Sequence, residues 1–213
     1  MSFSLADILQ VIADALLVPD MIVLVAFMLL TVWQVGDIIV ELIVDRRKLK
    51  ADVARMLSEL HGRTWADISA QIDESRLLAR HKRVLHQIFD ADGLSRSSRL
   101  ALAERVLGTE EKHYASGTAV TDIIAKLGPM FGLLGTLIPL GPGIIALSNG
   151  DTATLADSLG VAFNTTIAGV ASSSVCYVIS HVRKGWYGDY MLTLETLTES
   201  IIEEVHGEAE VHA

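Results

Sequence analysis

The apolar residues of this 213-residue chain are gathered in blocks, and most charged residues lie between the blocks. The longest blocks are Leu127–Leu147 and Leu155–Val182, which are separated by the short polar turn Ser148–Thr154. A helix crosses the hydrocarbon core of a bilayer with about 20 apolar residues at about 1.5 Å each. Both blocks reach that length. The pattern therefore predicts an all-α, polytopic membrane protein in which residues 121–182 form a hairpin of two spans.

The amino-terminal apolar block is predicted to contain two segments, which meet at Pro19. Residues 1–18 carry apolar side chains at helical spacing with polar residues between them, which predicts an outward-facing amphipathic helix on the membrane surface. Pro19 and Asp20 are then expected to open a first transmembrane helix over 19–44. No basic residue precedes Arg46, which argues against a cleaved secretory signal. A plain extension of the first span through its amino-terminal side is the alternative that the pattern leaves open.

Two acidic residues, Asp37 and Glu41, lie in the last third of this first span. They are four residues apart and so share one helix face. A carboxylate at the bilayer centre costs about 2.5–3.5 kcal/mol on insertion scales, so this face is expected to meet protein or water. The two acids belong either to an ion path or to a solvated inner vestibule.

The region 45–120 is charged and is predicted to be a cytoplasmic helical region. The apolar period of the first span continues past the membrane, and Gly62 is expected to end it. A second helix is predicted to begin at Thr64, which has Asp67 three residues later as a weak capping box, and to run to about Phe89.

Three further features complete the predicted helices. Ser95–Leu107 is expected to form a short helix that Gly108 closes, and Thr109 is expected to start the helix that leads into the membrane. Residues 183–213 are predicted to form a cytoplasmic helix packed on a neighbour, followed by an acidic tail.

Charge placement predicts the topology. All 17 Lys and Arg residues lie within 46–126 or at positions 183 and 184. Basic residues are enriched in cytoplasmic loops. The amino terminus and the turn at 148–154 are therefore expected to face outward, and the carboxyl terminus is expected to be cytoplasmic.

Composition and motifs exclude several classes of function. The net charge of −9 provides no basic face for a nucleic acid, and the single Cys176 allows no internal disulfide framework. His81 and His86 are five residues apart, so they face different sides of a helix and do not indicate a metal pair. The sequence contains no paired-carboxylate site, zinc signature or nucleophile motif, so we expect no enzyme, cofactor or metal site.

Small and hydroxyl-bearing residues follow two helical stripes in the hairpin. The first stripe consists of Gly132, Thr136, Pro139 and Gly143. The second consists of Ser158, Ala162, Thr165, Gly169, Ser172 and Cys176, with Thr166 and Ser173 beside it. Such stripes serve either close helix packing, with each hydroxyl bonded to its own backbone, or the lining of a pore. Spacing alone leaves both possibilities open.

Two segments of the hairpin resemble a known family. Residues 128–136, GPMFGLLGT, resemble the APLLGLLGT block of the MotA/TolQ/ExbB proton channel family, and residues 155–170, LADSLGVAFNTTIAGV, are similar to a second block of that family. The resemblance covers about 60 residues. The order of one span, a cytoplasmic helical region and a two-span hairpin also fits the three-span ExbB/TolQ-like branch.

This resemblance implies a homopentamer in the inner cell membrane that surrounds a dimer of single-span, ExbD/TolR/MotB-like partner subunits. The partner would carry the essential Asp, and ion flow would move its helices to energise transport or an envelope process. Threonines of the pentamer line the ion path in this family, and their positions here are Thr136 and Thr166, with Thr165 adjacent. Pro139 and Ser173 complete the candidate lining. Five residues are candidates for helix packing: Gly128, Gly132, Gly135, Gly143 and Gly169.

The sequence departs from the family pattern at three places. Val161 stands where ExbB-like members carry a Glu, so the conducted ion is either H⁺ or Na⁺. Pro139 and Pro142 are expected to kink their span. Ser172–Ser174 replaces a Pro that is common in the last span. The alternative function is a non-conducting helical scaffold that assembles partner proteins in the membrane.

Overall fold

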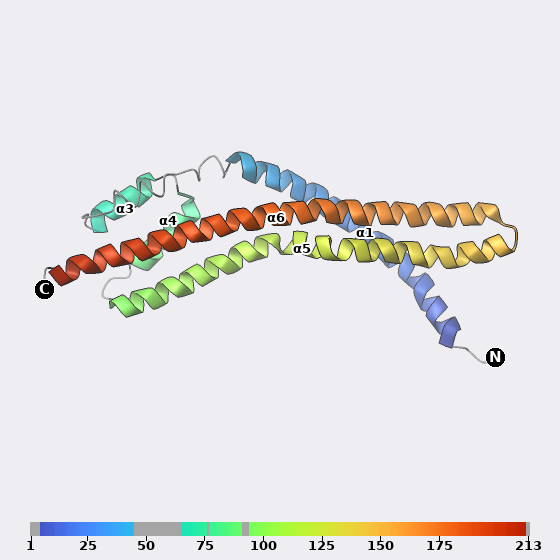
Figure 1. Cartoon of the computed structure of the whole chain (residues 1–213), viewed down its shortest axis with the longest axis horizontal. Coiled ribbons are helices and arrows are strands. Elements are labelled where there is room, and N and C mark those ends of the chain that lie inside the picture. Colours follow the sequence, from blue (N-terminus) through green and yellow to red (C-terminus); the bar gives the residue numbers. More distant parts are fainter. Residues whose placement is uncertain (1–4, 45–64, 76, 91–93, 212–213) are drawn as a thin grey trace. The chain divides into compact units, whose positions relative to one another are not determined.

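The computed structural model of the chain describes residues 5–44, 65–75, 77–90 and 94–211. These residues form five helices and no strand. The helices are labelled in Figure 1. The helices are α1 (Leu5–Val44), α3 (Trp65–Glu74), α4 (Ala79–Phe89), α5 (Arg96–Ser148) and α6 (Thr152–Val211). The predicted all-α fold class is confirmed.

Three of these helices, α1, α5 and α6, are long and apolar enough to cross a membrane. Large apolar side chains on them remain uncovered by the chain itself; the side chain of Trp33 on α1 is 76% exposed, and that of Phe163 on α6 is 63% exposed. A helix satisfies its own backbone hydrogen bonds, so such side chains can face lipid without cost. The three predicted spans are therefore confirmed as helices of the required length and composition.

Helix α1 does not divide at Pro19. It runs without interruption from Leu5 to Val44, so the described residues of the predicted surface helix and of the predicted first span form one continuous helix. A proline inside a helix removes one backbone hydrogen bond. The helix residues on both sides of Pro19 keep their own backbone hydrogen bonds, so the helix continues through it. The expected ending at Gly62 and the start at Thr64 lie outside the described residues.

The single helix that the sequence predicted up to Phe89 is two helices. α3 ends at Glu74 and α4 begins at Ala79, with the end at Phe89 as predicted. At the break, the Ser75 hydroxyl donates to Ile72 O at 2.6 Å and accepts from the Leu77 N–H at 3.4 Å. A serine that bonds the backbone in this way competes with the helical ladder. The apolar spacing on both sides concealed this break.

Helix α5 contradicts the predicted break at Gly108. It is continuous through that glycine and through Pro129, Pro139 and Pro142. Its start is close to the predicted one, because the Ser95 hydroxyl accepts the N–H of Ser98 at 3.2 Å as a helix cap. A glycine within a helix costs only about 1 kcal/mol, which the rest of a long helix offsets. The predicted helix over Ser95–Leu107 and the membrane helix are thus one element.

The described residues belong to two compact units, which α1, α5 and α6 each traverse. Unit 1 comprises the described residues of Met1–Asp37 and Thr118–Val182, and unit 2 comprises those of Ile38–Gly117 and Arg183–Ala213. Unit 1 contains the hairpin. Unit 2 contains α3, α4 and the parts of α1, α5 and α6 that lie outside unit 1.

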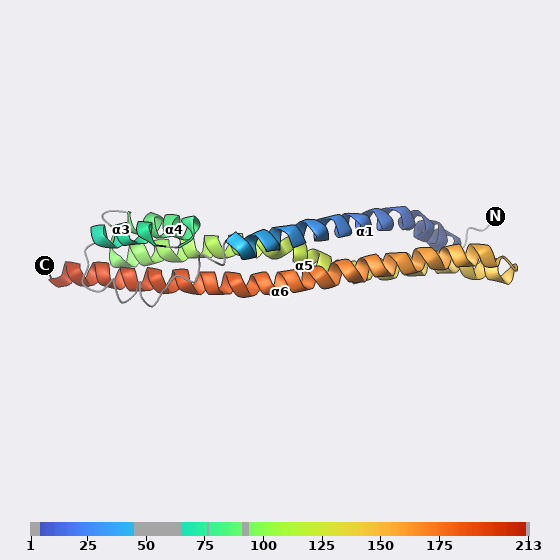
Figure 2. The same cartoon turned by 90° about the horizontal axis from the view of Figure 1, so that it is seen from above.

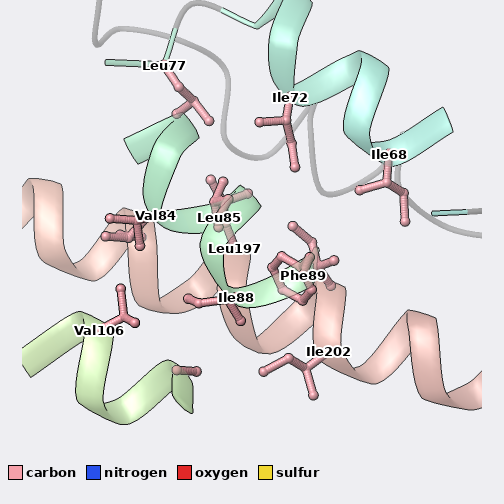
Figure 3. Close-up of a cluster of buried hydrophobic side chains, with 13 residues drawn as sticks. Ile68, Ile72, Leu77, Val84, Leu85, Ile88, Phe89, Val106, Leu197 and Ile202 are labelled. Carbon is pink, nitrogen blue, oxygen red and sulfur yellow. The ribbon is translucent and has the colours of Figure 1, made fainter. Parts of the chain in front are cut away.

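Unit 2 has an apolar core that four helices share (Figure 3). Ile72 of α3, Phe89 of α4 and Leu197 of α6 are each at most 1% exposed. Val106 of α5 closes the cluster from the fourth helix. Burial of one such side chain stabilises a fold by about 1.5–3 kcal/mol. The part of α6 that lies in unit 2 packs on this core, as its apolar stripe predicted.

In unit 1, α5 and α6 run antiparallel from a tight turn, and both views show them side by side (Figures 1 and 2). Gly150 occupies the turn with a φ of +80°, a conformation that glycine adopts without strain. Asp151 then accepts the N–H of Thr154 at 3.0 Å and caps α6. The turn sets the register in which the two membrane helices meet.

Candidate ion pathway in the membrane hairpin

The two helices of the hairpin meet at backbone distance. A Cβ placed on Gly132 would lie 3.3 Å from Thr165 O and 3.4 Å from Gly169 Cα, and a Cβ on Gly169 would lie 2.9 Å from Gly132 Cα. A Cβ on Gly128 would lie 2.9 Å from Ser173 Cβ. Small residues allow membrane helices to approach in this way. The positions that the sequence proposed for helix packing therefore lie in the contact between α5 and α6.

The same contact extends toward the turn. A Cβ on Gly143 would lie 3.0 Å from Ser158 Cβ, and a Cβ on Gly135 would lie 2.6 Å from Thr165 Cβ. Each facing pair is nearly equally far from the turn along both helices. The hairpin therefore has one uniform antiparallel register over most of its length.

Three of the candidate lining residues are packed inside the chain. Thr165 is 7% exposed, and its hydroxyl donates to Ala162 O at 2.9 Å. Ser173 is 6% exposed and donates to Val170 O at 3.0 Å, and Pro139 is also buried. Within one chain, Thr165 and Ser173 therefore lie in the contact between α5 and α6, opposite Gly135 and Gly128, and Pro139 is buried.

Thr136 and Thr166 differ from these three because they are half-buried. The Thr136 hydroxyl donates to Leu133 O at 2.6 Å, and the Thr166 hydroxyl donates to Ala162 O at 3.1 Å. Each follows a contact position, Gly135 on α5 and Thr165 on α6. In an antiparallel pair of right-handed helices, the residues that follow the two contact positions turn to the same face of the pair. The two threonines therefore lie on one face of the hairpin, and each oxygen retains acceptor capacity.

Helix α1 packs on the hairpin through side chains. The rings of Phe27 and Phe131 meet edge to face with centroids 5.7 Å apart. Thr31 Oγ1 lies 3.3 Å from Cys176 Sγ and donates to Phe27 O at 2.7 Å. The buried residue Leu24 lies on the same face of α1, one turn before Phe27.

Asp20 continues this packed face, which was not predicted from the sequence. It was expected at the mouth of the first span, yet it is 2% exposed, and a Cβ on Gly135 would lie 2.7 Å from its Oδ2. Neither carboxylate oxygen has a hydrogen-bond partner among the described residues. The signal was present in the sequence, because Asp20 lies seven residues before Phe27 and therefore on the face that α1 buries.

The chain also matches a family by sequence. The sequence model of the MotA/TolQ/ExbB proton channel family matches residues 69–196, which is more than half of the chain. The chain belongs to this family. No curated protein matches it. Together with its three apolar helices, the match makes the chain a multi-pass membrane protein of a family of channels rather than of enzymes.

The departures of this MotA/TolQ/ExbB family member from the expected pattern have clear positions in the structure. Val161 is half-buried, and its carbonyl accepts the Thr165 hydroxyl at 3.1 Å. Pro139 and Pro142 lie within α5, which stays helical around both. In the serine run, Ser172 and Ser173 are buried, and the third serine is exposed. The replacements therefore leave both spans helical and place two hydroxyls in the packed interior.

Glu41 has a structural partner in this family member. Its Oε2 accepts from Arg183 Nε at 2.9 Å, and the side chains of Glu41 and Arg183 are 15% and 4% exposed. The pair lies in unit 2 and joins α1 to α6. Of the two roles that the sequence left open for Glu41, neither describes this ion pair. Asp37 is exposed.

Unit 2 also contains a cleft of about 630 Å³ beside a group of aromatic rings. Tyr114, Tyr187 and Tyr190 line it together with basic side chains of α4. His81 packs behind it, with Nε2 3.0 Å from the Tyr114 hydroxyl. Burial lowers the pKa of His81 below its usual value. The nearby Arg80 is already paired with Glu110, so this cleft is partly neutralised.

Proposed function

We propose that this chain is the multi-span subunit of a stator-type ion channel. Five copies enclose a dimer of single-span, ExbD/TolR/MotB-like partners, and a carboxylate of the partner carries the ion past the hairpin. The ion is H⁺ or Na⁺. Its flow moves the partner helices and energises transport or a process of the cell envelope.

The observation that carries this proposal is the shared face of Thr136 and Thr166. Most other hydroxyls of the two spans are turned into the packing, whereas these two are half-buried on one side of the hairpin. A hydroxyl that donates to its own backbone still accepts a hydrogen bond from a protonated carboxyl or coordinates a cation. The backbone contact around Gly132 and Gly169 fixes the position of α5 relative to α6, and so the positions of both threonines.

Charge supports the proposed orientation in the inner membrane. Every Lys and Arg except Lys126 lies in the sequence range of unit 2, and unit 1 has none between Lys126 and Val182. Basic segments are retained on the cytoplasmic side. In the proposed topology unit 2 is cytoplasmic, and the amino terminus and the turn at Gly150 face outward.

The experiment is an ion-flux assay on liposomes that contain this chain and its single-span partner. Thr136→Val and Thr166→Val each remove one hydroxyl while preserving shape. Loss of one hydrogen bond of about 1.4 kcal/mol in the rate-limiting state predicts about a tenfold lower flux for each variant. Thr196→Val is the matched control, because Thr196 is an exposed threonine of α6 outside the hairpin.

The outcomes separate the proposals. Unchanged flux in both variants removes the two threonines from the path. Separate gradients of H⁺ and of Na⁺ identify the conducted ion. A complex that contains the partner but conducts neither ion would contradict the proposed ion channel and support the alternative function, a non-conducting helical scaffold.

A further inference from the structure

The buried carboxyl group of Asp20 is the feature that the proposed channel does not use. It comes from α1 and lies against Gly135 of α5 and Thr165 of α6. A Cβ on Gly135 would lie 2.7 Å from both Asp20 Oδ2 and Thr165 Oγ1, so these two oxygens are at most twice that distance apart. Only 2% of the Asp20 residue is exposed, and both of its carboxylate oxygens are buried.

The position of Asp20 along the hairpin places it deep in the membrane. Gly135 lies thirteen residues before the end of α5 at Ser148, and Thr165 lies thirteen residues after the start of α6 at Thr152. At about 1.5 Å per residue, this level is roughly 20 Å from the turn. The hydrocarbon core is about 30 Å thick. A turn at the outer surface therefore sets Asp20 near the middle of the bilayer rather than at its edge.

An ionised carboxylate at this position would have no compensation. No hydrogen bond or ion pair joins either oxygen of Asp20 to a described residue. A buried charge without a partner is so costly that the group takes up a proton instead. An acid inside a membrane bundle that is not paired for structure marks an ion or proton site. The neutral acid is the form that this surrounding favours.

The geometry selects a proton over a metal cation. Sodium requires several oxygen ligands at once to replace its hydration shell. Thr165 supplies one hydroxyl oxygen near Asp20, and the adjacent carbonyls of Val161 and Ala162 already accept that hydroxyl. A proton needs only the carboxyl, and a protonated Asp20 can donate its O–H toward Thr165 Oγ1 after a rotation about its side-chain bonds.

We propose that Asp20 is a proton-binding site of this subunit, and that its protonation and deprotonation are a step of conduction in addition to the partner's acid. The carboxylate takes a proton from hydronium on one side of the membrane, so one O–H bond of hydronium breaks as the carboxyl O–H bond forms. The carboxyl then gives this proton to water on the other side, which regenerates the carboxylate and hydronium. The conduction part of this proposal rests on the proposed function. The reversible protonation of Asp20 does not.

The first test measures the proton directly in the full chain with its partner in lipid. Infrared difference spectra of the wild type against Asp20→Asn should contain the C=O band of one protonated carboxylic acid. Dicyclohexylcarbodiimide, an apolar reagent that adds to protonated acids, should label the peptide that contains Asp20, and Na⁺ should not protect it. Absence of both signals overturns the proposal, and protection by Na⁺ replaces the proton with sodium.

The second test measures flux. Asp20→Asn preserves size and removes the exchangeable proton, so proton flux should fall at least tenfold, and Asp20→Glu should restore part of it. Asp14→Asn is the matched control, because Asp14 is an exposed acid of the same helix. Wild-type flux in Asp20→Asn overturns the conduction step. If even the wild type conducts no ion, the proposed channel fails, and the infrared and labelling results still decide whether Asp20 binds a proton.

Discussion

Unit 1 and unit 2 differ in the apolar side chains that they bury. Unit 2 buries large apolar side chains such as Phe89 and Ile72. Unit 1 buries small and polar residues such as Gly132, Ser173 and Asp20, alongside a few aliphatic ones, and leaves large apolar side chains exposed. Water drives apolar groups together, whereas lipid does not distinguish them from its own chains. The comparison shows that each unit is organised for a different solvent, within the same continuous helices.

The largest expected effect is a cavity in the core of unit 2. Phe89→Ala should lower the free energy of unfolding of unit 2 by about 3–5 kcal/mol, because the ring is 1% exposed. Phe163→Ala removes the same group from unit 1, where the ring is 63% exposed, and should leave the thermal transition almost unchanged. Thermal unfolding in detergent, followed by circular dichroism, measures both. Equal losses would show that the two units do not differ in this way.

A smaller effect is expected from adding volume to the hairpin. A Cβ on Gly169 would lie 2.9 Å from Gly132 Cα and would also contact Gly128 O, so Gly169→Val should destabilise the hairpin by about 1–3 kcal/mol. Gly160→Val is the control, because nothing lies within 4 Å of a Cβ there. Resistance of the hairpin to proteolysis in detergent distinguishes the two variants. Equal resistance would contradict the backbone contact.

The smallest effect concerns pH and belongs to unit 2. Burial lowers the pKa of His81 in the folded state, so the unfolded state binds more protons on acidification. Stability should be complete above the unfolded pKa of about 6.5 and should fall as the pH drops below it. His81→Gln should flatten this dependence by up to about 1 kcal/mol, and His113→Gln, at an exposed position, should not. Denaturant titrations at several pH values measure it, and a steeper dependence in His81→Gln would contradict the assignment.

Features that depend on long stretches of sequence were predictable. The spans around Phe163 and Trp33 follow from hydropathy, because twenty apolar residues leave few alternatives to a membrane helix. The contact of Gly132 with Gly169 follows from helical spacing of small residues. The family resemblance likewise depended on two long blocks, and the match to residues 69–196 bears it out.

Features that depend on a balance between local and distant effects were not predictable. Gly108 is a local breaker, but the helix around it is long enough to tolerate it. Ser75 ends a helix through one hydroxyl that the apolar spacing does not reveal. The sequence places Asp20 at the edge of a span, because it does not reveal that Gly135 and Thr165 lie beside it. Of these three residues, only Asp20 depends on contacts from distant parts of the chain, whereas Gly108 and Ser75 depend on the balance within their own helices.

The glycine contact between α5 and α6 has a mechanical consequence. Where Gly128 and Gly132 touch Gly169, no side chain stands between the two backbones, so no change of rotamer can slide one helix along the other. We therefore expect α5 and α6 to move together as one rigid pair. Helix α1 instead meets the hairpin through side chains, which are Phe27 against Phe131, Thr31 against Cys176 and Asp20 against Gly135, so rotation of side chains can change this contact. We therefore expect movement within unit 1 to begin between α1 and the hairpin.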